Sequence, residues 1–181
     1  GPAGYPWTVV GQKSGEQFDL AAPDKTLGRL AVEGWITSEQ AQKLFRAAGK
    51  DFQALKKAAA TRAFQPMALG WRAKVAIRNT LRTVDSRNVL AKLTGSDVKH
   101  RQEYVVFTAH WDHLGIGPAV DGDMIYNGAF DNASGVATLL EIARAAKQLR
   151  VPPRRPLVFL AVTAEEQGLL GARYYALNPL Y

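Results

Sequence analysis

The chain has 181 residues, of which 47% are hydrophobic and 22% charged, enough for one sizeable domain or for one domain and part of another. It contains no cysteine and no run of 18 apolar residues, which excludes a disulfide framework, a thiolate metal site and a membrane-spanning helix. The net charge of +7 comes from residues 38–102, which hold 14 Lys and Arg and 4 Asp and Glu, and we interpret these charges as solvated helix faces and not as a nucleic-acid surface.

The pattern of the N-terminal part changes from strand-like to helical. Residues 1–37 combine Gly, Pro and isolated aromatic residues with short apolar runs, which predicts short strands and turns. A capping box that begins at Thr37 predicts a helix that stops at Gly49. Asp51 is expected to cap a second helix over about residues 52–64.

Pro66 ends the helical pattern, and we place a domain boundary directly after it, between a first domain at residues 1–66 and a second at residues 67–181. In the second domain, apolar alternation over residues 73–77 predicts a strand, and residues 88–93 form another strand candidate. The change from helical to strand-like periodicity is the reason for this boundary.

Two continuous apolar runs, at residues 104–109 and 157–163, are typical of strands buried on both faces of a sheet. Between them, residues 134–149 have helical periodicity, and two prolines end this helix. Its inward face is expected to consist of Val136, Leu139, Leu140, Ala143 and Ala146. A strand, a helix and a second strand in this order predict an α/β sheet.

Residue types that can bind metal ions follow both apolar runs. His110 and Asp112 come directly after the first run, and Glu165 and Glu166 come directly after the second. Asp131 stands in a glycine-flanked loop before the predicted helix. Because active sites of open α/β sheets gather at the carboxyl ends of strands, we expect these side chains to face one crevice.

A neutral imidazole and carboxylates are suitable zinc ligands, so His110, Asp131 and Glu166 are candidate ligands. Asp112 is placed to orient a ligand, and Glu165 is then free to act as a general base on water. Each residue also has an ordinary structural interpretation, such as a helix cap for Asp131 or a solvated turn for the two glutamates. The combination favours a site, because two glutamates after a buried strand are costly unless cations compensate their charge.

Two neighbouring residues remain open to either interpretation. His113 can line the crevice or have a structural role, and we do not include it among the site residues. Trp111 can form a wall of a pocket or belong to the core, and a core position is the more common one for tryptophan.

Three segments of the chain together resemble a known family. They are residues 103–115 (EYVVFTAHWDHLG), 122–135 (GDMIYNGAFDNASG) and 159–171 (FLAVTAEEQGLLG). Their order and spacing resemble those of the co-catalytic zinc exopeptidases, which include bacterial leucyl aminopeptidases and glutamate carboxypeptidase II. The resemblance covers about residues 72–181 and implies an α/β fold, a three-layer α/β/α sandwich on a mixed sheet, of which this chain holds an incomplete part.

The resemblance also implies a role for each site residue. His110 is then a ligand of one zinc ion, Glu166 is a ligand of the other, and Asp131 is the carboxylate that bridges the two. Glu165 corresponds to the general base, and Asp112 corresponds to the aspartate that orients the site. The implied cofactors are two zinc ions in each complete catalytic domain.

Relatives of this type often carry an inserted protease-associated domain before the catalytic core. Residues 1–66 resemble the C-terminal part of such a small α+β domain and its exit helices, particularly over residues 32–52 (VEGWITSEQAQKLFRAAGKDF). The family needs a further Asp and a further His beyond the Glu-Glu motif, and this sequence begins with neither an initiator methionine nor a signal peptide. We therefore expect a fragment that has an incomplete metal site and is inactive by itself.

The activity that the resemblance implies is the release of N-terminal residues from peptides by an aminopeptidase. The protein is then secreted or periplasmic, as members of the family generally are, and its partner is a peptide substrate and not a nucleic acid. A carboxypeptidase or dipeptidase of the same family is an alternative, and so is a non-catalytic, receptor-like binding module on the same fold. The intact ligand set favours an enzyme, because a binding module has no reason to keep it. The sequence does not indicate an oligomeric state.

Overall fold

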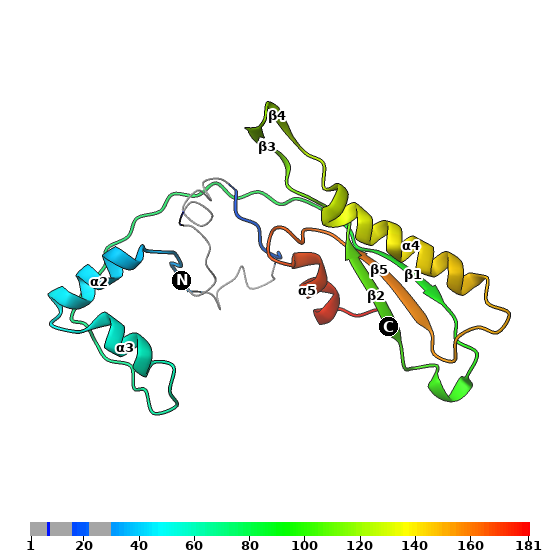
Figure 1. Cartoon of the computed structure of the whole chain (residues 1–181), viewed down its shortest axis with the longest axis horizontal. Helices are drawn as coiled ribbons and strands as arrows, with labels where there is room; N and C mark the ends of the chain where they lie inside the picture. The colour runs from blue at the N-terminus through cyan, green and yellow to red at the C-terminus, as the bar shows by residue number, and fades with distance from the viewer. Residues whose placement is uncertain (1–6, 8–15, 22–29) are drawn as a thin grey trace. The chain divides into compact units, whose positions relative to one another are not determined.

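The computed structural model describes residue 7, residues 16–21 and residues 30–181 (Figure 1). These residues form two compact units that divide between Leu81 and Arg82, later in the chain than the predicted boundary after Pro66, and residues 17–21 belong to the second unit. The described residues within 1–37 contain no strand, so the short strands predicted there are not found among them. The rest of that range lies outside the described residues.

The helices of the first unit begin where their local caps predict. Helix α2 spans Ser38–Ala47, and Thr37 Oγ1 accepts a hydrogen bond at 3.1 Å from the backbone N–H three residues on. Helix α3 spans Phe52–Ala58, and Asp51 Oδ1 accepts two hydrogen bonds, at 2.8 and 3.0 Å, from backbone N–H groups in the first turn. Each cap satisfies N–H groups that have no partner inside the helix. Both predicted helix starts are confirmed.

Helix α3 ends earlier than residue 64, where the sequence predicted its end. After Ala58 the backbone tightens, because the N–H and the hydroxyl of Thr61 both donate to Ala58 O, at 2.9 and 2.8 Å. Hydrogen bonds to the third residue back, in place of the fourth, end the α-helical pattern. The two helices pack through Phe45 and Phe52, whose rings meet edge to face with centroids 5.2 Å apart.

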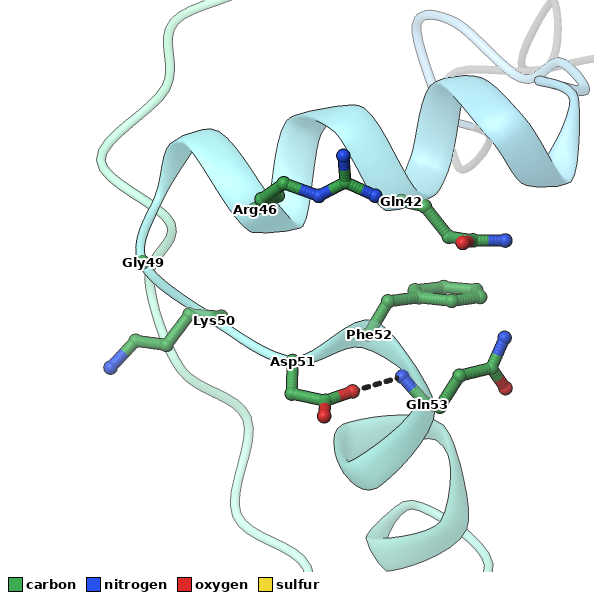
Figure 2. Close-up of a pocket in the computed structure, with 7 residues that line it drawn as sticks. All are labelled: Gln42, Arg46, Gly49, Lys50, Asp51, Phe52 and Gln53. Atoms are coloured by element: carbon green, nitrogen blue, oxygen red, sulfur yellow. Dashed lines mark hydrogen bonds between the residues drawn. The ribbon is translucent and has the colours of Figure 1, made fainter.

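A hollow of about 470 Å³ lies at the junction of α2 and α3 (Figure 2). It is lined by Gln42, Arg46, Gly49, Lys50, Asp51, Phe52 and Gln53. Gly49 has a φ of +68°, a left-handed conformation that lets the chain turn from one helix into the next. None of the candidate metal ligands lines this hollow, so it is a feature of the helical turn and not of the predicted site.

The strand predicted over residues 73–77 is wrong. Residues 64–88 have no regular secondary structure, and Val75 and Ile77, which the alternation placed on one buried face, are 53% and 62% exposed. A strand needs a hydrogen-bonded neighbour, and no strand in the described part of the chain pairs with this segment. Apolar alternation alone therefore overestimated the strand content here.

Three strands of the second unit form a mixed sheet in the order β1-β5-β2 (Figure 1). Strand β1 (Val89–Leu93) runs antiparallel to β5 (Leu157–Val162), and β2 (Val105–His110) runs parallel to β5. The sequence patterns predict all three strands to within one residue at each end. The prediction of an α/β fold on a mixed sheet is thus confirmed.

The two continuous apolar runs differ in burial. Five of the six residues of β5 are buried, as expected for a central strand with neighbours on both sides. Strand β2 was expected to be equally buried, but its Val105 and Val106 are 39% and 48% exposed. Within the described chain β2 is an edge strand, so its first residues have cover from fewer neighbours.

Helix α4 (Ser134–Lys147) packs along one face of this sheet (Figure 1). The buried core cluster consists of Ala109, Leu139, Ala146, Leu157 and Phe159. Val136 and Ala143 pack against it, which gives the helix one apolar stripe at spacings of three and four residues. Leu140 was predicted to face inward but is 62% exposed, because one step along a helix turns the side chain about 100° away from that of Leu139.

A hairpin that the sequence analysis missed lies between β2 and α4. Strands β3 (Gly115–Val120) and β4 (Asp123–Tyr126) pair antiparallel, joined by Asp121 and Gly122. Both joining residues have positive φ, 51° and 88°, as a two-residue turn of type I′ requires. The Asp-Gly pair was the sequence signal for this hairpin.

Hydrogen bonds between charged side chains join the loop before β2 to the loop before β5. Arg154 donates to Asp97 Oδ2 at 2.8 Å, and Arg155 donates to Glu103 Oε2 at 2.8 Å. His100 Nδ1 lies 2.9 Å from Glu103 Oε1. The pKa of Glu103 lies below its ordinary value. The hydrogen bond with His100 is the largest cause, and the hydrogen bond with Arg155 is the second. These contacts lie at the end of the strands that is opposite to His110.

Helix α5 (Leu170–Leu177) follows the loop after β5, and it begins in close contact with that loop. The N–H of Gly171 donates to Thr163 O at 3.0 Å. A Cβ at Gly171 would overlap Thr163 O and would lie 2.6 Å from Asn88 Oδ1, so the close approach requires glycine. Among the described helices, none combines the length and the apolar character that crossing a membrane requires.

Candidate functional site

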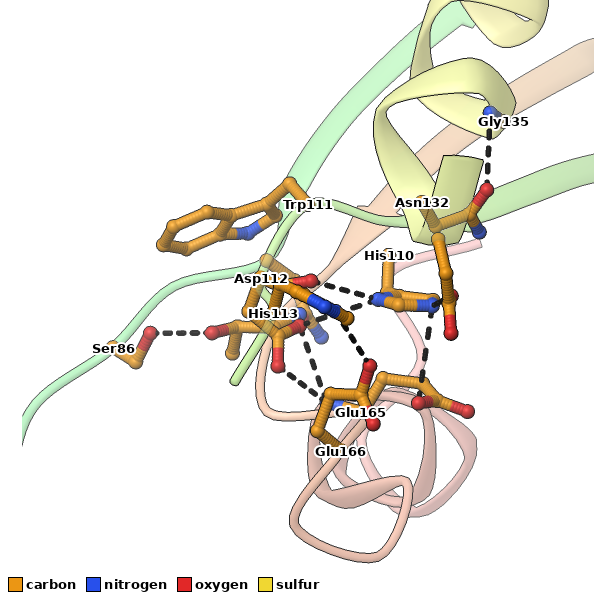
Figure 3. Close-up of polar contacts among 12 residues, drawn as sticks. Ser86, His110, Trp111, Asp112, His113, Asn132, Gly135, Glu165 and Glu166 are labelled. Carbon is orange, nitrogen blue, oxygen red and sulfur yellow. Dashed lines mark hydrogen bonds and ion pairs between the residues drawn. The ribbon is translucent and has the colours of Figure 1, made fainter. Parts of the chain in front are cut away.

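The predicted site residues come together where β2 and β5 end (Figure 3). His110 is the last residue of β2, and Asp112 follows it by two positions. Glu165 and Glu166 lie in the loop after β5. Asp131 lies in the single irregular turn that precedes α4. Because β2 and β5 are parallel neighbours, their carboxyl ends lie at the same edge of the sheet, as the sequence analysis expected.

His110 is the most buried of these side chains, with 8% of the residue exposed. Its Nδ1 lies 3.0 Å from the backbone oxygen of Asp112, which only accepts, so Nδ1 carries the hydrogen. In a neutral His110, Nε2 therefore carries a lone pair and no hydrogen, and it lies 2.9 Å from Asp131 Oδ1. Two acceptors at this distance need a proton or a cation between them.

Three ligand atoms that suit a metal ion, one each from His110, Asp131 and Glu166, lie within 4.8 Å of one another. Imidazole nitrogens and carboxylate oxygens are both ligands that zinc takes in proteins. Together with the lone pair of His110, this donor chemistry fits a divalent cation. The structure thus brings together the three residues that the sequence analysis named as ligands, and their role as ligands stays a prediction.

Asp112 holds two parts of the site at once. Its carboxylate accepts from the backbone N–H of Glu165, with Oδ1 at 3.2 Å and Oδ2 at 3.0 Å, while its backbone oxygen accepts from His110. This places Glu165 Oε2 at 3.8 Å from His110 Nε2. Because the side chain of Glu165 is 32% exposed, its carboxylate can reach water beside the cluster.

The negative charges of the cluster act on the protonation of His110. Burial alone lowers the pKa of His110, but the hydrogen bond to the Asp112 carbonyl, the charge of Glu165 and the hydrogen bond to Asp131 outweigh it. The pKa of His110 is therefore raised above its ordinary value. The same carboxylates that stabilise an imidazolium ion would stabilise a bound cation.

The loop before α4 separates the task of capping the helix from the task of facing His110. Asn132 Oδ1 accepts from the N–H of Gly135 at 3.0 Å, and so Asn132 satisfies the start of the helix. Asp131 has non-helical backbone angles, φ −116° and ψ 90°, and its side chain contacts His110. The structural alternative, in which Asp131 only caps the helix, is wrong, because the capping hydrogen bond is made by Asn132.

Two further side chains belong to this site although the sequence analysis did not assign them. His113 Nδ1 lies 2.9 Å from Glu166 Oε1 (Figure 3), so this histidine contacts a candidate ligand. Asn88 hydrogen-bonds both ends of the loop that carries Glu165 and Glu166, to Thr163 N at 3.1 Å and to Gly171 O at 2.8 Å. The first contact had a sequence signal, because His113 follows His110 and Asp112 closely enough to line the same crevice. The second had no sequence signal, because Asn88 lies far away along the chain.

Comparison with known proteins gives a consistent result. The model of peptidase family M28 matches residues 88–180. Aminopeptidase YwaD of Bacillus subtilis is 37% identical over 90 residues, which are 50% of this chain and 17% of that protein. A probable zinc metalloprotease of Leptosphaeria maculans is 39% identical over 89 residues, which are 49% of this chain and 20% of that protein. Carboxypeptidase Q of Rattus norvegicus is 36% identical over 95 residues, 52% of this chain and 18% of that protein.

Among solved structures, the crystal structure of a zinc aminopeptidase from Bacillus subtilis matches with 34% sequence identity and a TM-score of 0.41. The match covers 50% of this chain and 20% of that one. The matched part of the chain thus spans no more than a fifth of the length of each of these relatives.

Proposed function

Because the chain belongs to peptidase family M28, we propose that the complete protein is a zinc-dependent exopeptidase that acts as an aminopeptidase, releasing N-terminal residues from peptides. The observation that carries the proposal is the convergence of His110, Asp131 and Glu166, with Glu165 beside them, at one edge of the sheet. The names of two relatives, an aminopeptidase and a probable zinc metalloprotease, support this choice.

We propose two zinc ions as the cofactors. His110 would hold one ion and Glu166 the other, and Asp131, whose carboxylate has two oxygens, would contact both. When bound, zinc supplies Lewis-acid catalysis and lowers the pKa of water. Since a catalytic zinc usually has three protein ligands, these three residues are too few for two ions, and further ligands would come from other parts of the complete protein.

The remaining residues supply proton transfer and orientation. Glu165 would take a proton from water at a carboxylate oxygen and pass it to the amine that leaves when the peptide bond breaks. Asp112 would take no part in proton transfer but would position two other residues. Its carboxylate fixes the backbone of Glu165, and its carbonyl fixes the ring of His110. This division explains why two adjacent glutamates take different roles.

The wider architecture is part of the same proposal. We propose that residues 67–181 are the N-terminal part of a three-layer α/β/α catalytic domain, and that residues 1–66 are the C-terminal part of a protease-associated domain. Export from the cell, to the periplasm or the medium, belongs to the proposal as well. The support for these points is the family membership and the resemblance of the segments described above.

A second candidate is a carboxypeptidase of the same family, which the similarity to carboxypeptidase Q favours. Both activities use the same metal chemistry and differ in the peptide terminus that the enzyme binds. A non-catalytic binding module is less consistent with the site, because it has no use for three converging ligands with a carboxylate next to them.

The experiment uses the complete protein, purified, stripped of metal and reconstituted with zinc. The substrates are two versions of one peptide, the first with a free N-terminus and an amidated C-terminus, the second with an acetylated N-terminus and a free C-terminus. We expect zinc-dependent cleavage of the first peptide only. Cleavage of only the second peptide would favour the carboxypeptidase, and no cleavage by a protein that binds zinc would contradict the proposed function.

A further inference from the structure

One hydrogen bond to a candidate ligand comes from a residue that the proposed mechanism does not use. His113 Nδ1 lies 2.9 Å from Glu166 Oε1, and the side chains of both residues are mostly buried, with 22% and 18% exposed. A carboxylate accepts hydrogen bonds only, so Nδ1 of His113 carries the hydrogen in this contact. One oxygen of Glu166 is therefore held, and the other remains available to a metal ion.

A second contact joins His113 to the loop that carries Asp131. Gly128 stands at the start of that loop with a φ of +64°, and a Cβ at Gly128 would lie 2.8 Å from both Cβ and Cγ of His113. The histidine thus packs directly against the backbone of Gly128. Its ring lies between the segments that carry two of the three candidate ligands.

We propose that His113 is a positioning residue for the metal site. The hydrogen bond from its Nδ1 sets the orientation of Glu166, and its contact with Gly128 sets the distance between Glu166 and the loop that carries Asp131. The proposal rests on the proposed function, because it assigns His113 to the same zinc site. Ligating carboxylates are generally held by hydrogen bonds from outside the ligand set, and loss of such a partner typically weakens metal binding by about 10- to 100-fold.

The chain offers a matched control for this contact. His100 Nδ1 lies 2.9 Å from Glu103 Oε1, the same distance between the same atom types, but at the opposite end of the strands. A general effect of removing a histidine–glutamate contact would appear in both places. An effect on the metal site would appear only for His113.

The test compares three variants of the complete protein, His113→Leu, His113→Asn and His100→Leu, with the parent. Leucine removes the donor, whereas asparagine places an amide N–H near the position of Nδ1. Zinc affinity is measured by competition with a chromophoric chelator, and the absorption spectrum of the Co²⁺ form reports on ligand geometry. We expect His113→Leu to bind zinc about 10- to 100-fold more weakly with an altered Co²⁺ spectrum. The other two variants should stay close to the parent.

Unchanged zinc affinity and Co²⁺ spectrum in His113→Leu would overturn the proposal, and so would equal losses in His113→Leu and His113→Asn. If the leucine variant does not fold, His113→Gln replaces it, because its amide reaches beyond the Nδ1 position and should bind zinc more weakly than His113→Asn. A parent protein that binds no zinc would instead contradict the proposed function and remove the site on which the inference rests.

Discussion

The loop that carries Glu165 and Glu166 depends on one side chain from a distant part of the sequence. Asn88 uses both ends of its amide, accepting from Thr163 N at 3.1 Å and donating to Gly171 O at 2.8 Å. Leucine branches at the same carbon as asparagine but has no hydrogen-bonding atoms, so replacement of Asn88 by leucine removes both hydrogen bonds without leaving a cavity. We expect this loop to open more readily in Asn88→Leu.

The magnitude follows from the groups involved. Each lost hydrogen bond is worth about 1 kcal/mol, and an N–H left without a partner in a partly buried position adds about 1 kcal/mol or more. The free energy of loop opening should fall by roughly 2–4 kcal/mol, which corresponds to a decrease in amide protection of roughly 30- to 700-fold. Because Glu165 and Glu166 are part of this loop, the catalytic rate and the zinc affinity should decrease as the loop opens more often.

Amide hydrogen exchange in the complete protein measures this opening directly at residues 163–171. The control is Asn178→Leu, because the side chain of Asn178 donates one exposed hydrogen bond, to Tyr174 O at 3.0 Å. That substitution should change the free energy by about 0.5 kcal/mol or less. Equal protection of residues 163–171 in Asn88→Leu and in the control would show that Asn88 does not hold this loop closed.

Three other predictions address the base, the loop and the opposite end of the sheet. Glu165→Gln should keep its zinc but lose about 10²- to 10⁴-fold in turnover, whereas Glu166→Gln should lose zinc as well, which metal analysis beside peptidase rates would show. Gly171→Ala should destabilise the protein by about 1–3 kcal/mol in urea unfolding, because the added methyl group overlaps the backbone at the other end of the loop. His100→Leu should raise the pKa of Glu103, followed by ¹³C NMR. Since that pKa is lowered in the folded protein, the stability from this contact is present above the ordinary glutamate pKa and is lost as pH falls through the lowered value.

Local signals predicted much of the fold. The starts of α2 and α3 follow from Thr37 and Asp51, because a helix cap involves residues only two or three positions apart. Strand β5 follows from one continuous apolar run. The placement of His110 and Glu166 near each other also follows from local information, since His110 ends one strand of a parallel pair and Glu166 lies in the loop after the other.

The features that the sequence analysis missed depend on contacts between distant residues. The segment around Val75 alternates like a strand, but a strand also needs a partner, and none in the described chain lies beside it. Leu140 lies one step outside the buried stripe of α4, a difference that only the packing direction decides. The contacts of Asn88 and His113 each join residues more than fifty positions apart, so that periodicity and spacing do not indicate them.

We propose that His110, Asp131 and Glu166 hold zinc in the complete protein. Crystals of the complete protein, grown with zinc and measured on both sides of the zinc absorption edge, would locate the ions from their anomalous scattering. We predict two peaks about 3.5–4 Å apart, one beside His110 and one beside Glu166, with the carboxylate of Asp131 between them. Zinc bound elsewhere, with His110 and Glu166 both outside its coordination sphere, would show that these residues are not the zinc ligands.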